Sequence, residues 1–393
     1  QFDYKGTYYS GTVYHGGEEY KENLLKIFSK FCWTNPLHPD LFKSIRQMEI
    51  DIINMTISLF HGDKNCCGNV TMGGTESILL ACKAYRDWGR EQKGITNPNI
   101  LAYNTVHPAF DKACHYFNIK LIKKPRDYKL INYINSDTIC IVGSCPDYSY
   151  GLLDDIEELS DYAVEKNIGL HVDCCLGGFV LPFLVQSKQF QYNFDFQLKG
   201  VTSISADTHK YGYSLKGSSL LLWRNIEYKH YQHYISIKWN GGIYGTPTTL
   251  GSKSGALIAA TWGALLLNGR EKYENYSIII YDNLNDIKTY FKNNIFIDVI
   301  GDPKVNVIAF KSDTHDIYKI ASEMHKKGWK LSILQNPPAF HLCITHLHTK
   351  ETCKKFISDL HNSITFVVTS PSVKLEGTLA LYGSNSKIEN SFF

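Results

Sequence analysis

Short apolar runs alternate with amphipathic stretches through the middle of the chain, and this pattern predicts an α/β fold. The apolar runs that indicate strands lie at residues 100–104, 119–123, 138–143, 169–173 and 201–206. Between them, residues 111–117 and 154–167 have helical spacing, with Ile156, Leu159 and Ala163 on one face of the second stretch. Strands that alternate with helices predict a mostly parallel sheet covered on both faces by helices.

The pattern changes after residue 270, where a long amphipathic stretch precedes shorter strands such as residues 305–310. We therefore predict an amino-terminal arm over residues 1–45, a large domain over residues 46–270 and a smaller carboxyl-terminal α+β domain over residues 271–393. The apolar run at residues 255–267 is shorter than the roughly 20 residues that cross a bilayer, so it predicts a core or interface helix.

Composition narrows the possible functions. The chain has 393 residues, of which 44% are hydrophobic, and its net charge of +3 comes from scattered basic residues, so nucleic acid is not a predicted partner. The eleven cysteines show no regular spacing, which favours reduced thiols in a reducing compartment. His341, His346 and His348 could be imagined as metal ligands around Cys343, but a strand and a turn are favoured, and no metal site is predicted.

A candidate reactive lysine, Lys210, follows the last predicted strand in the run Ser-Ala-Asp-Thr-His-Lys-Tyr-Gly-Tyr. In many pyridoxal-phosphate enzymes a lysine behind a histidine at such a position binds the cofactor as a Schiff base. The lysine must lose its proton to attack an aldehyde, which burial or nearby cations promote. A structural lysine in a loop is the alternative, and this segment alone does not choose between them.

Two further segments suit the same cofactor. Asp173 ends the strand at residues 169–173, where ligands gather in open α/β sheets, and a carboxylate there can hold the pyridinium nitrogen of the cofactor protonated. Gly73 and Gly74 let the backbone approach an anion, and Thr75 can cap the helix that follows, which together would make a phosphate cradle. The alternatives are an aspartate that caps a turn and an ordinary helix start.

His107 follows the strand at residues 100–104 and could lie flat on a pyridine ring. A histidine before a proline is more often a residue at a helix start, so this signal is weak by itself. The four segments in this order resemble the fold-type-I pyridoxal-phosphate enzymes of the group II decarboxylase superfamily. Motifs at residues 11–14, 35–40, 211–219, 241–248 and 251–255 are, within that superfamily, similar to those of the sphingosine-1-phosphate lyases.

The resemblance extends from about residue 11 to residue 384 and includes two departures. Lys253 and Ser254 stand where the family usually carries Arg-Pro, and a lysine lacks the planar fork of arginine. Ser149 replaces the second proline of the family's run around Tyr148, while the aromatic residue is retained.

The resemblance implies a set of roles for the site residues. Lys210 and Tyr148 would be the catalytic residues, with Tyr148 as the acid or base and Lys210 as a competitor for that role. The implied cofactor-binding residues are Gly74, Thr75, His107, Asp173, His209 and Lys210, together with Gly251 and Ser252 reaching the site of the neighbouring subunit. The implied ligands of the substrate phosphate are Tyr14, Asn35, His38 and Lys216.

The resemblance also implies the reaction, which is retro-aldol cleavage of the bond between carbons 2 and 3 of a phosphorylated long-chain base. The products would be a long-chain fatty aldehyde and phosphoethanolamine. An amino-acid decarboxylase of the same fold is the alternative enzyme, although a site for a carboxylate would more naturally use arginine than Lys216. A non-catalytic scaffold is the third possibility, and the presence of Lys210, Asp173 and His107 argues against it.

The expected assembly is a homodimer with shared active sites, in which the amino-terminal arm packs against the partner subunit, as in the resembled family. The expected location is a reducing, cytosol-facing compartment. Eukaryotic members of the family carry an amino-terminal membrane anchor, so an upstream segment of that kind would place the protein at the endoplasmic reticulum membrane.

Overall fold

The computed structural model describes residues 6–370, which divide into two compact units. The large unit comprises residues 17–148 and 153–274, and the small unit comprises residues 6–16, 149–152 and 275–370 within the described range. The predicted boundary at residue 45 falls inside a helix, as does the predicted boundary at residue 270. The division into arm, large domain and small domain stays a prediction.

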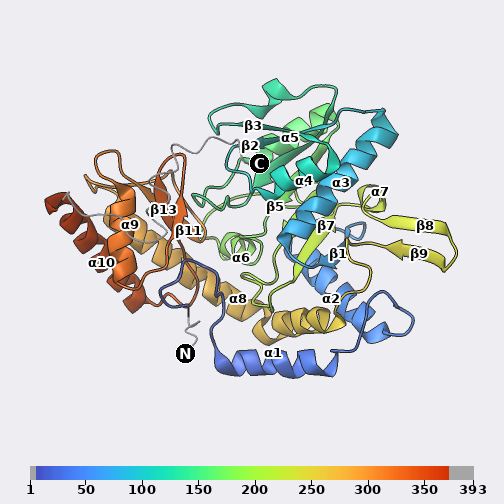
Figure 1. The fold of residues 1–393 in the computed structure, drawn as a ribbon, viewed down its shortest axis with the longest axis horizontal. Helices are drawn as coiled ribbons and strands as arrows, with labels where there is room; N and C mark the ends of the chain where they lie inside the picture. The colour runs from blue at the N-terminus through green and yellow to red at the C-terminus, as the bar shows by residue number, and fades with distance from the viewer. Residues whose placement is uncertain (1–5, 371–393) are drawn as a thin grey trace. The chain divides into compact units, whose positions relative to one another are not determined.

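The large unit is built on a seven-stranded sheet with the order β1-β7-β6-β5-β4-β2-β3 (Figure 1). Only β7 runs antiparallel to its neighbours, so the other six strands point the same way. The predicted mostly parallel sheet is thereby confirmed. The strands are β1 (Cys67–Thr71), β2 (Asn99–Tyr103), β3 (Lys120–Lys124), β4 (Thr138–Ser144), β5 (Gly169–Asp173), β6 (Ser203–Ala206) and β7 (Ser219–Trp223).

Burial explains the composition of these strands. Strands β2, β4 and β5 are buried at every position, as expected for parallel strands covered on both faces, and this makes them apolar throughout rather than alternating. Strand β3 lies at the edge and carries exposed Lys120 and Lys123, which discourage pairing with another chain. His171 and Asp173 are the charged or titratable exceptions in β5, and their burial requires polar partners.

Helices connect and cover these strands, and α3 packs beside α4 against a shared apolar core that includes Ile78, Tyr85 and Phe110 (Figure 1). The fifth helix follows its predicted bounds closely, because Asp155 caps its start and Asn167 ends it in the left-handed conformation. The helices of the large unit are α1 (Glu18–Lys30), α2 (Lys43–Leu59), α3 (Gly74–Lys93), α4 (Ala109–Phe117), α5 (Ile156–Lys166), α6 (Leu181–Gln186) and α7 (Ile226–His230), with a 3-10 turn, η1, at Leu130–Tyr133.

A two-stranded ribbon, β8 (Tyr234–Trp239) and β9 (Gly242–Thr246), extends beyond α7 (Figure 1). It is followed by α8 (Gly255–Phe291), which begins in the large unit and ends in the small one. Gly269, with φ 59° and ψ 176°, interrupts α8, so the predicted helix at residues 255–267 is its first part. Among residues 6–370, no helix is long and apolar enough to cross a membrane.

The small unit contains a four-stranded antiparallel sheet with the order β10-β11-β13-β12. Its strands are β10 (Asp298–Val299), β11 (Val307–Lys311), β12 (Ser332–Leu334) and β13 (Ala339–Cys343), and its helices are α9 (Ile317–Lys326) and α10 (Lys350–Thr369). Ser10 is fastened to this sheet, because its hydroxyl donates to the His341 carbonyl and accepts from the Cys343 N–H. The antiparallel sheet and the two helices confirm the predicted smaller α+β lobe.

Candidate active site

The predicted site residues of the large unit follow the carboxyl ends of the parallel strands. Gly73 and Gly74 follow β1, His107 follows β2, and Tyr148 follows β4. Asp173 ends β5, and Lys210 follows β6. Because these strands run in one direction, the residues lie along one edge of the sheet, which is where ligands bind in open α/β folds.

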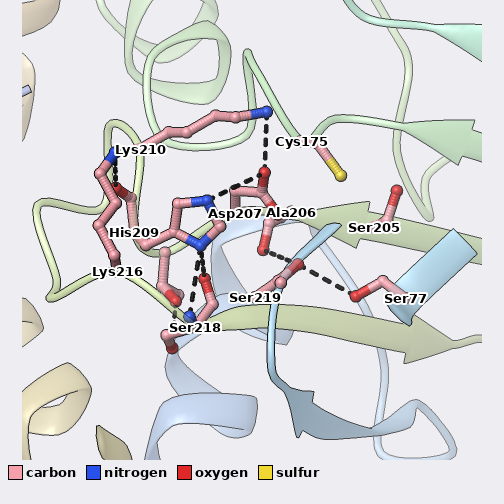
Figure 2. A network of polar contacts seen from close by, with 12 residues as sticks. Ser77, Cys175, Ser205, Ala206, Asp207, His209, Lys210, Lys216, Ser218 and Ser219 are labelled. Carbon is pink, nitrogen blue, oxygen red and sulfur yellow. Dashed lines mark hydrogen bonds and ion pairs between the residues drawn. The ribbon is translucent and has the colours of Figure 1, made fainter. Parts of the chain in front are cut away.

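Lys210 forms an ion pair with Asp207, a residue that the sequence patterns did not single out. The Lys210 Nζ lies 2.8 Å from the Asp207 Oδ2, and the His209 Nε2 lies 3.7 Å from the same oxygen (Figure 2). Burial disfavours the charged carboxylate, but the neighbouring charges of Lys210 and His209 outweigh it and lower the pKa of Asp207. Asp207 is therefore an anion that holds the Lys210 ammonium in place.

The start of α3 closes against this ion pair. A Cβ atom on Gly74 would lie 2.7 Å from the Asp207 Oδ1 and 2.8 Å from the Cys175 Sγ, so a side chain at this position would collide with both. Gly73 has a φ of 139°, which side-chain-bearing residues rarely adopt. These two glycines therefore bring the amino end of α3 and its unpaired backbone N–H groups close to the Lys210 turn.

The Cys175 thiol lies near two of the predicted cofactor-binding residues, Asp173 and Lys210. Burial raises the pKa of the Cys175 thiol, the charges of Asp173 and Asp207 raise it further, and the charge of Lys210 lowers it. The thiol thus lies within electrostatic range of all three groups, and Figure 2 shows Cys175 beside the Lys210–Asp207 pair. Lys210 follows β6 and Asp173 ends β5, and both therefore lie near the buried Cys175 thiol.

Asp173 is 7% exposed, and its Oδ1 accepts two hydrogen bonds. One comes from the Cys175 N–H at 3.0 Å and the other from the Ser205 hydroxyl at 3.2 Å. The first bond closes a turn, so the capping role considered for this aspartate is also present. Both hydrogen bonds go to the same oxygen and hold the carboxylate in one orientation.

Thr75 does not cap α3, which corrects the sequence-based expectation. The capping position is Gly73, the helix begins at Gly74, and Thr75 lies exposed in the first turn. Just before this start, the Met72 N–H donates to the Glu76 Oε2 at 2.6 Å. The other oxygen of Glu76 accepts from the Thr249 N–H at 2.8 Å.

His107 and His209 are both oriented by backbone groups. The Nδ1 of His107 accepts from the Ala109 N–H at 3.1 Å, so this ring also serves the helix start. The Nδ1 of His209 lies 2.5 Å from the Ser218 carbonyl, and burial lowers the pKa of His209 against the opposing charge of Asp207. Ser218 fixes the His209 ring beside the Lys210 turn (Figure 2).

Lys216 adds a second cation to this turn. Its Nζ lies 3.5 Å from the His209 carbonyl oxygen, and its side chain is exposed. Desolvation and the charge of Lys210 lower the pKa of Lys216 to about 8. Lys216 is therefore a cation at neutral pH that loses its charge in mildly alkaline solution.

Asn35 and Ser252 are brought together, although they lie far apart in the sequence. The Asn35 Nδ2 donates to the Ser252 Oγ at 3.1 Å, and the Asn35 Oδ1 accepts from the Lys253 N–H at 3.4 Å. A cavity of about 570 Å³ lies beside these residues and is lined by Pro36, Pro39, Arg46, Gly251 and Lys253 among others. His38 lies on the same loop, where its carbonyl accepts from the Leu41 and Phe42 N–H groups.

Lys253, which stands where the family usually has an arginine, contacts one backbone carbonyl and one carboxylate through its single Nζ atom. Its Nζ donates to the Val70 carbonyl at 2.7 Å and lies 3.7 Å from the Glu49 Oε1, which itself accepts from the Val70 N–H. The lysine thus ties its segment to β1.

Tyr14 belongs to the small unit, where its hydroxyl lies close to Gly11.

The loop that carries Tyr148 is held by Arg126, another residue that sequence patterns did not identify. The Arg126 Nη1 lies 2.5 Å from the Asp154 Oδ1 and 3.6 Å from the Asp147 Oδ2, and Nη2 donates to the Leu153 carbonyl at 2.6 Å. Arg126 therefore binds both ends of the loop between β4 and α5. Tyr148 itself is 47% exposed.

The histidines considered as metal ligands are packing residues of the small unit. The His346 ring stacks on Tyr276 with centroids 4.1 Å apart and meets His15 edge to face, and burial lowers the pKa of His346 to about 3. Within the described range, no three His, Cys, Asp or Glu side chains are arranged to hold a metal ion. All eleven cysteines are free thiols.

Comparison with known proteins identifies the class and then the family. The family model of the pyridoxal-dependent decarboxylase conserved domain matches residues 42–312, so the fold and the site are those of a pyridoxal-phosphate-dependent enzyme. A solved structure of a Lactobacillus brevis glutamate decarboxylase, 20% identical, shares the fold with a TM-score of 0.78 over 92% of this chain and 89% of that one.

The curated relatives narrow this class. Sphingosine-1-phosphate lyase 1 of Rattus norvegicus is 43% identical over 95% of this chain and 67% of its own, and the Drosophila melanogaster lyase is 41% identical over 96% and 71%. The structure of a Burkholderia pseudomallei sphingosine-1-phosphate lyase, 36% identical, has a TM-score of 0.88 over 94% of this chain and 91% of that one. The chain belongs to the sphingosine-1-phosphate lyase family of pyridoxal-phosphate enzymes.

The Asp154 carboxylate should make the stability of the protein depend on pH. Burial raises the pKa of Asp154 to about 7, against the opposing charge of Arg126. A raised folded-state pKa means that the folded protein retains its proton longer than the unfolded chain, so this contribution is complete below the unfolded pKa and is lost as the pH rises through about 7. Between pH 5 and pH 8 it should decrease by about 2 to 3 kcal/mol.

The comparison is between the wild type and Asp154→Asn, because asparagine has a similar shape and cannot ionise. Urea unfolding at pH 5 and pH 8 should show that the wild type loses this amount relative to the variant. Equal pH dependence in the two proteins would contradict the prediction.

Proposed function

We propose that this protein cleaves the bond between carbons 2 and 3 of sphingosine 1-phosphate and other phosphorylated sphingoid bases. The reaction is a retro-aldol cleavage that yields a long-chain fatty aldehyde and phosphoethanolamine. Family membership supports the reaction, and the observation that carries it is the placement of Lys210, with Asp207, beside Asp173 at one edge of the sheet. The identity of the curated relatives favours this lyase reaction over amino-acid decarboxylation.

The residues at the site fit pyridoxal phosphate. Asp173 is a buried carboxylate suited to the ring nitrogen, and Lys210, which like Asp173 acts electrostatically on the Cys175 thiol, is an amine suited to the aldehyde carbon. The amino end of α3 at Gly74 and Thr75 suits the phosphate, and the imidazoles of His107 and His209 suit the ring or phosphate. When bound, the cofactor supplies an electron sink for the carbanion that forms at carbon 2 of the substrate.

The protein's own groups move the protons of the reaction. Breaking the bond between carbons 2 and 3 requires a base to take the proton of the 3-hydroxyl group, as the carbon–oxygen bond becomes a carbonyl. Tyr148 is our candidate for this base, with Lys210 as a competitor once its amine is released. Carbon 2 retains the electron pair and receives a proton, which completes phosphoethanolamine.

Asp207 has a defined part in this scheme. In the ion pair it stabilises the Lys210 ammonium, which is not nucleophilic. The pair must therefore separate, or pass its proton on, when Lys210 bonds to the cofactor. The buried carboxylate then remains beside the nitrogen of Lys210, where it can hold a proton-bearing group in position.

Removal of Lys210 should abolish covalent attachment of pyridoxal phosphate. Purified wild-type protein should be yellow, and borohydride should fix the cofactor on residue 210, as detected by peptide mass spectrometry. Lys210→Ala should retain no cofactor after the same treatment and should not turn over substrate. Lys120→Ala, a change of an exposed lysine on edge strand β3, is the matched control and should behave as wild type.

The products distinguish the lyase from the alternative decarboxylase. With a phosphorylated sphingoid base, the wild type should release aldehyde and phosphoethanolamine in equal amounts. Carbon dioxide release from amino acids without aldehyde release from the sphingoid base would refute the proposed reaction.

Lys216 is proposed as a ligand of the substrate phosphate, together with Tyr14, Asn35 and His38. A phosphate dianion requires cationic or hydrogen-bonding partners. Because the pKa of Lys216 is lowered to about 8, binding of phosphoethanolamine should weaken as the pH rises through that value, approaching tenfold per pH unit. Calorimetric titration between pH 7 and pH 9.5 measures this dependence.

Two substitutions separate charge from shape at this position. Lys216→Arg keeps the charge through this range and should bind without the alkaline loss, whereas Lys216→Met should bind weakly at every pH. If Lys216→Arg lost affinity in parallel with the wild type, the dependence would belong to another group.

The proposed assembly is a homodimer in which Gly251 and Ser252 reach the cofactor of the other subunit. Two observations support it. Asn35 bonds to Ser252, so a proposed substrate residue and a proposed cofactor residue from distant parts of the sequence lie together. The preceding ribbon β8–β9 exposes Ile235, Ile237, Trp239 and Ile243, which form an apolar surface that a second copy would cover.

Activity should therefore follow the dimer. On size exclusion at decreasing protein concentration, specific activity should fall as the monomer appears. A fully active monomer would defeat the shared-site arrangement.

Location in a reducing compartment also stays a proposal, supported by the eleven free thiols.

A further inference from the structure

A line of buried side chains leads from α3 to Asp173. The Tyr85 hydroxyl lies 2.6 Å from the Ser203 Oγ, which lies 2.7 Å from the His171 Nδ1. The His171 Nε2 lies 3.0 Å from the Ser205 Oγ, which donates to the Asp173 Oδ1 at 3.2 Å. The first four side chains are each at most 1% exposed and Asp173 is 7% exposed, so the line is shielded from solvent.

The sheet itself sets this arrangement. His171 is paired with Ser203 and Asp173 with Ser205 across the parallel strands β5 and β6. Residues two apart in a strand point to the same face, so the four side chains alternate along one face of the sheet. The ring of Tyr85 enters this face because Gly169 has no side chain, as a Cβ there would lie 2.2 Å from the Tyr85 ring.

The donors and acceptors allow one direction. A carboxylate only accepts, so the single hydroxyl proton of Ser205 goes to Asp173, and the Ser205 oxygen must accept from the His171 Nε2–H. Burial lowers the pKa of His171 to about 4, so its ring is neutral and its Nδ1 accepts from the Ser203 hydroxyl. The single proton of the Tyr85 hydroxyl then goes to Ser203, and the Tyr85 oxygen accepts from the Thr202 hydroxyl 2.6 Å away.

Every movable proton in this line therefore points toward Asp173. The ring of His171 is also held sterically, since Phe110 meets it edge to face with centroids 5.7 Å apart. A flipped or differently protonated His171 would place two donors or two acceptors against each other. The line thus fixes the position of the Asp173 Oδ1 through the hydrogen bond that Ser205 donates.

We propose that His171 is a positioning residue which, through Ser205, holds the Asp173 carboxylate in the orientation that receives the ring nitrogen of bound pyridoxal phosphate. This inference rests on the proposed function, in which Asp173 partners that nitrogen. It assigns Tyr85, Ser203 and Ser205 to the same task, although none of them touches the cofactor.

Four variants test the proposal. Tyr85→Phe, Ser203→Ala and Ser205→Ala each remove one hydroxyl, and His171→Leu interrupts the line at its centre. The readout is the dissociation constant of pyridoxal phosphate, from titration of the apoprotein followed by the visible colour, with urea unfolding in parallel. Affinity should fall about five- to tenfold in Ser205→Ala and His171→Leu, less in Ser203→Ala, and about twofold or less in Tyr85→Phe.

A rescue and a control separate positioning from simple structural support. The amide of His171→Gln can donate to Ser205 and accept from Ser203, so it should restore most of the affinity lost in His171→Leu. Ser363→Ala removes a buried hydroxyl that donates to the Asp359 carbonyl in the small unit, and it should change stability without changing cofactor affinity.

The outcomes keep this inference apart from the proposed function. Wild-type protein that bound no pyridoxal phosphate would overturn the proposed function itself. Wild-type binding with unchanged affinity in Ser205→Ala and both His171 variants would overturn only the positioning role. Should one variant fail to fold, Tyr85→Phe and His171→Gln retain the shape of the core, and the order of their affinities decides the question.

Discussion

The site is organised around a buried ion pair, Lys210 with Asp207, at a separation of 2.8 Å. A buried carboxylate is costly unless it is paired, so this contact determines what may surround it. Gly74 must lack a side chain for α3 to start where it does, and the turn after β6 must return Lys210 toward its own strand. The amino end of α3, which is the proposed phosphate cradle, and the amine of Lys210 are thereby placed by the same contact.

Two buried aspartates at neighbouring strand ends have different environments. Asp207 faces cations, whereas Asp173 receives a hydroxyl and a backbone N–H. A neighbouring cation pairs with a carboxylate directly, whereas neutral donors orient a carboxylate without supplying a countercharge. The difference in partners explains why only one of these carboxylates is suited to a protonated ring nitrogen.

The sequence predicted the sheet well because its central strands are continuous apolar runs between amphipathic helices. Lys210 and Asp173 were identifiable because each follows such a run. The role of Asp207 was not, since it depends on the folded turn, and the contacts of His171 depend on strand register that no local pattern encodes. Thr75 was wrongly expected to cap α3, because the capping position is Gly73. The sequence-based assignment relied on a capping side chain, and a glycine offers none.

The Glu76 carboxylate binds two segments of the chain, one at Met72 and one at Thr249. One of its oxygens holds the N–H of Met72 before the phosphate cradle, and the other holds the N–H of Thr249, just before Gly251 and Ser252. In a dimer of the kind proposed, the segment after Thr249 would contact the neighbouring subunit. Subunit association and binding of pyridoxal phosphate would then be thermodynamically linked through one carboxylate, and each would strengthen the other by the same factor.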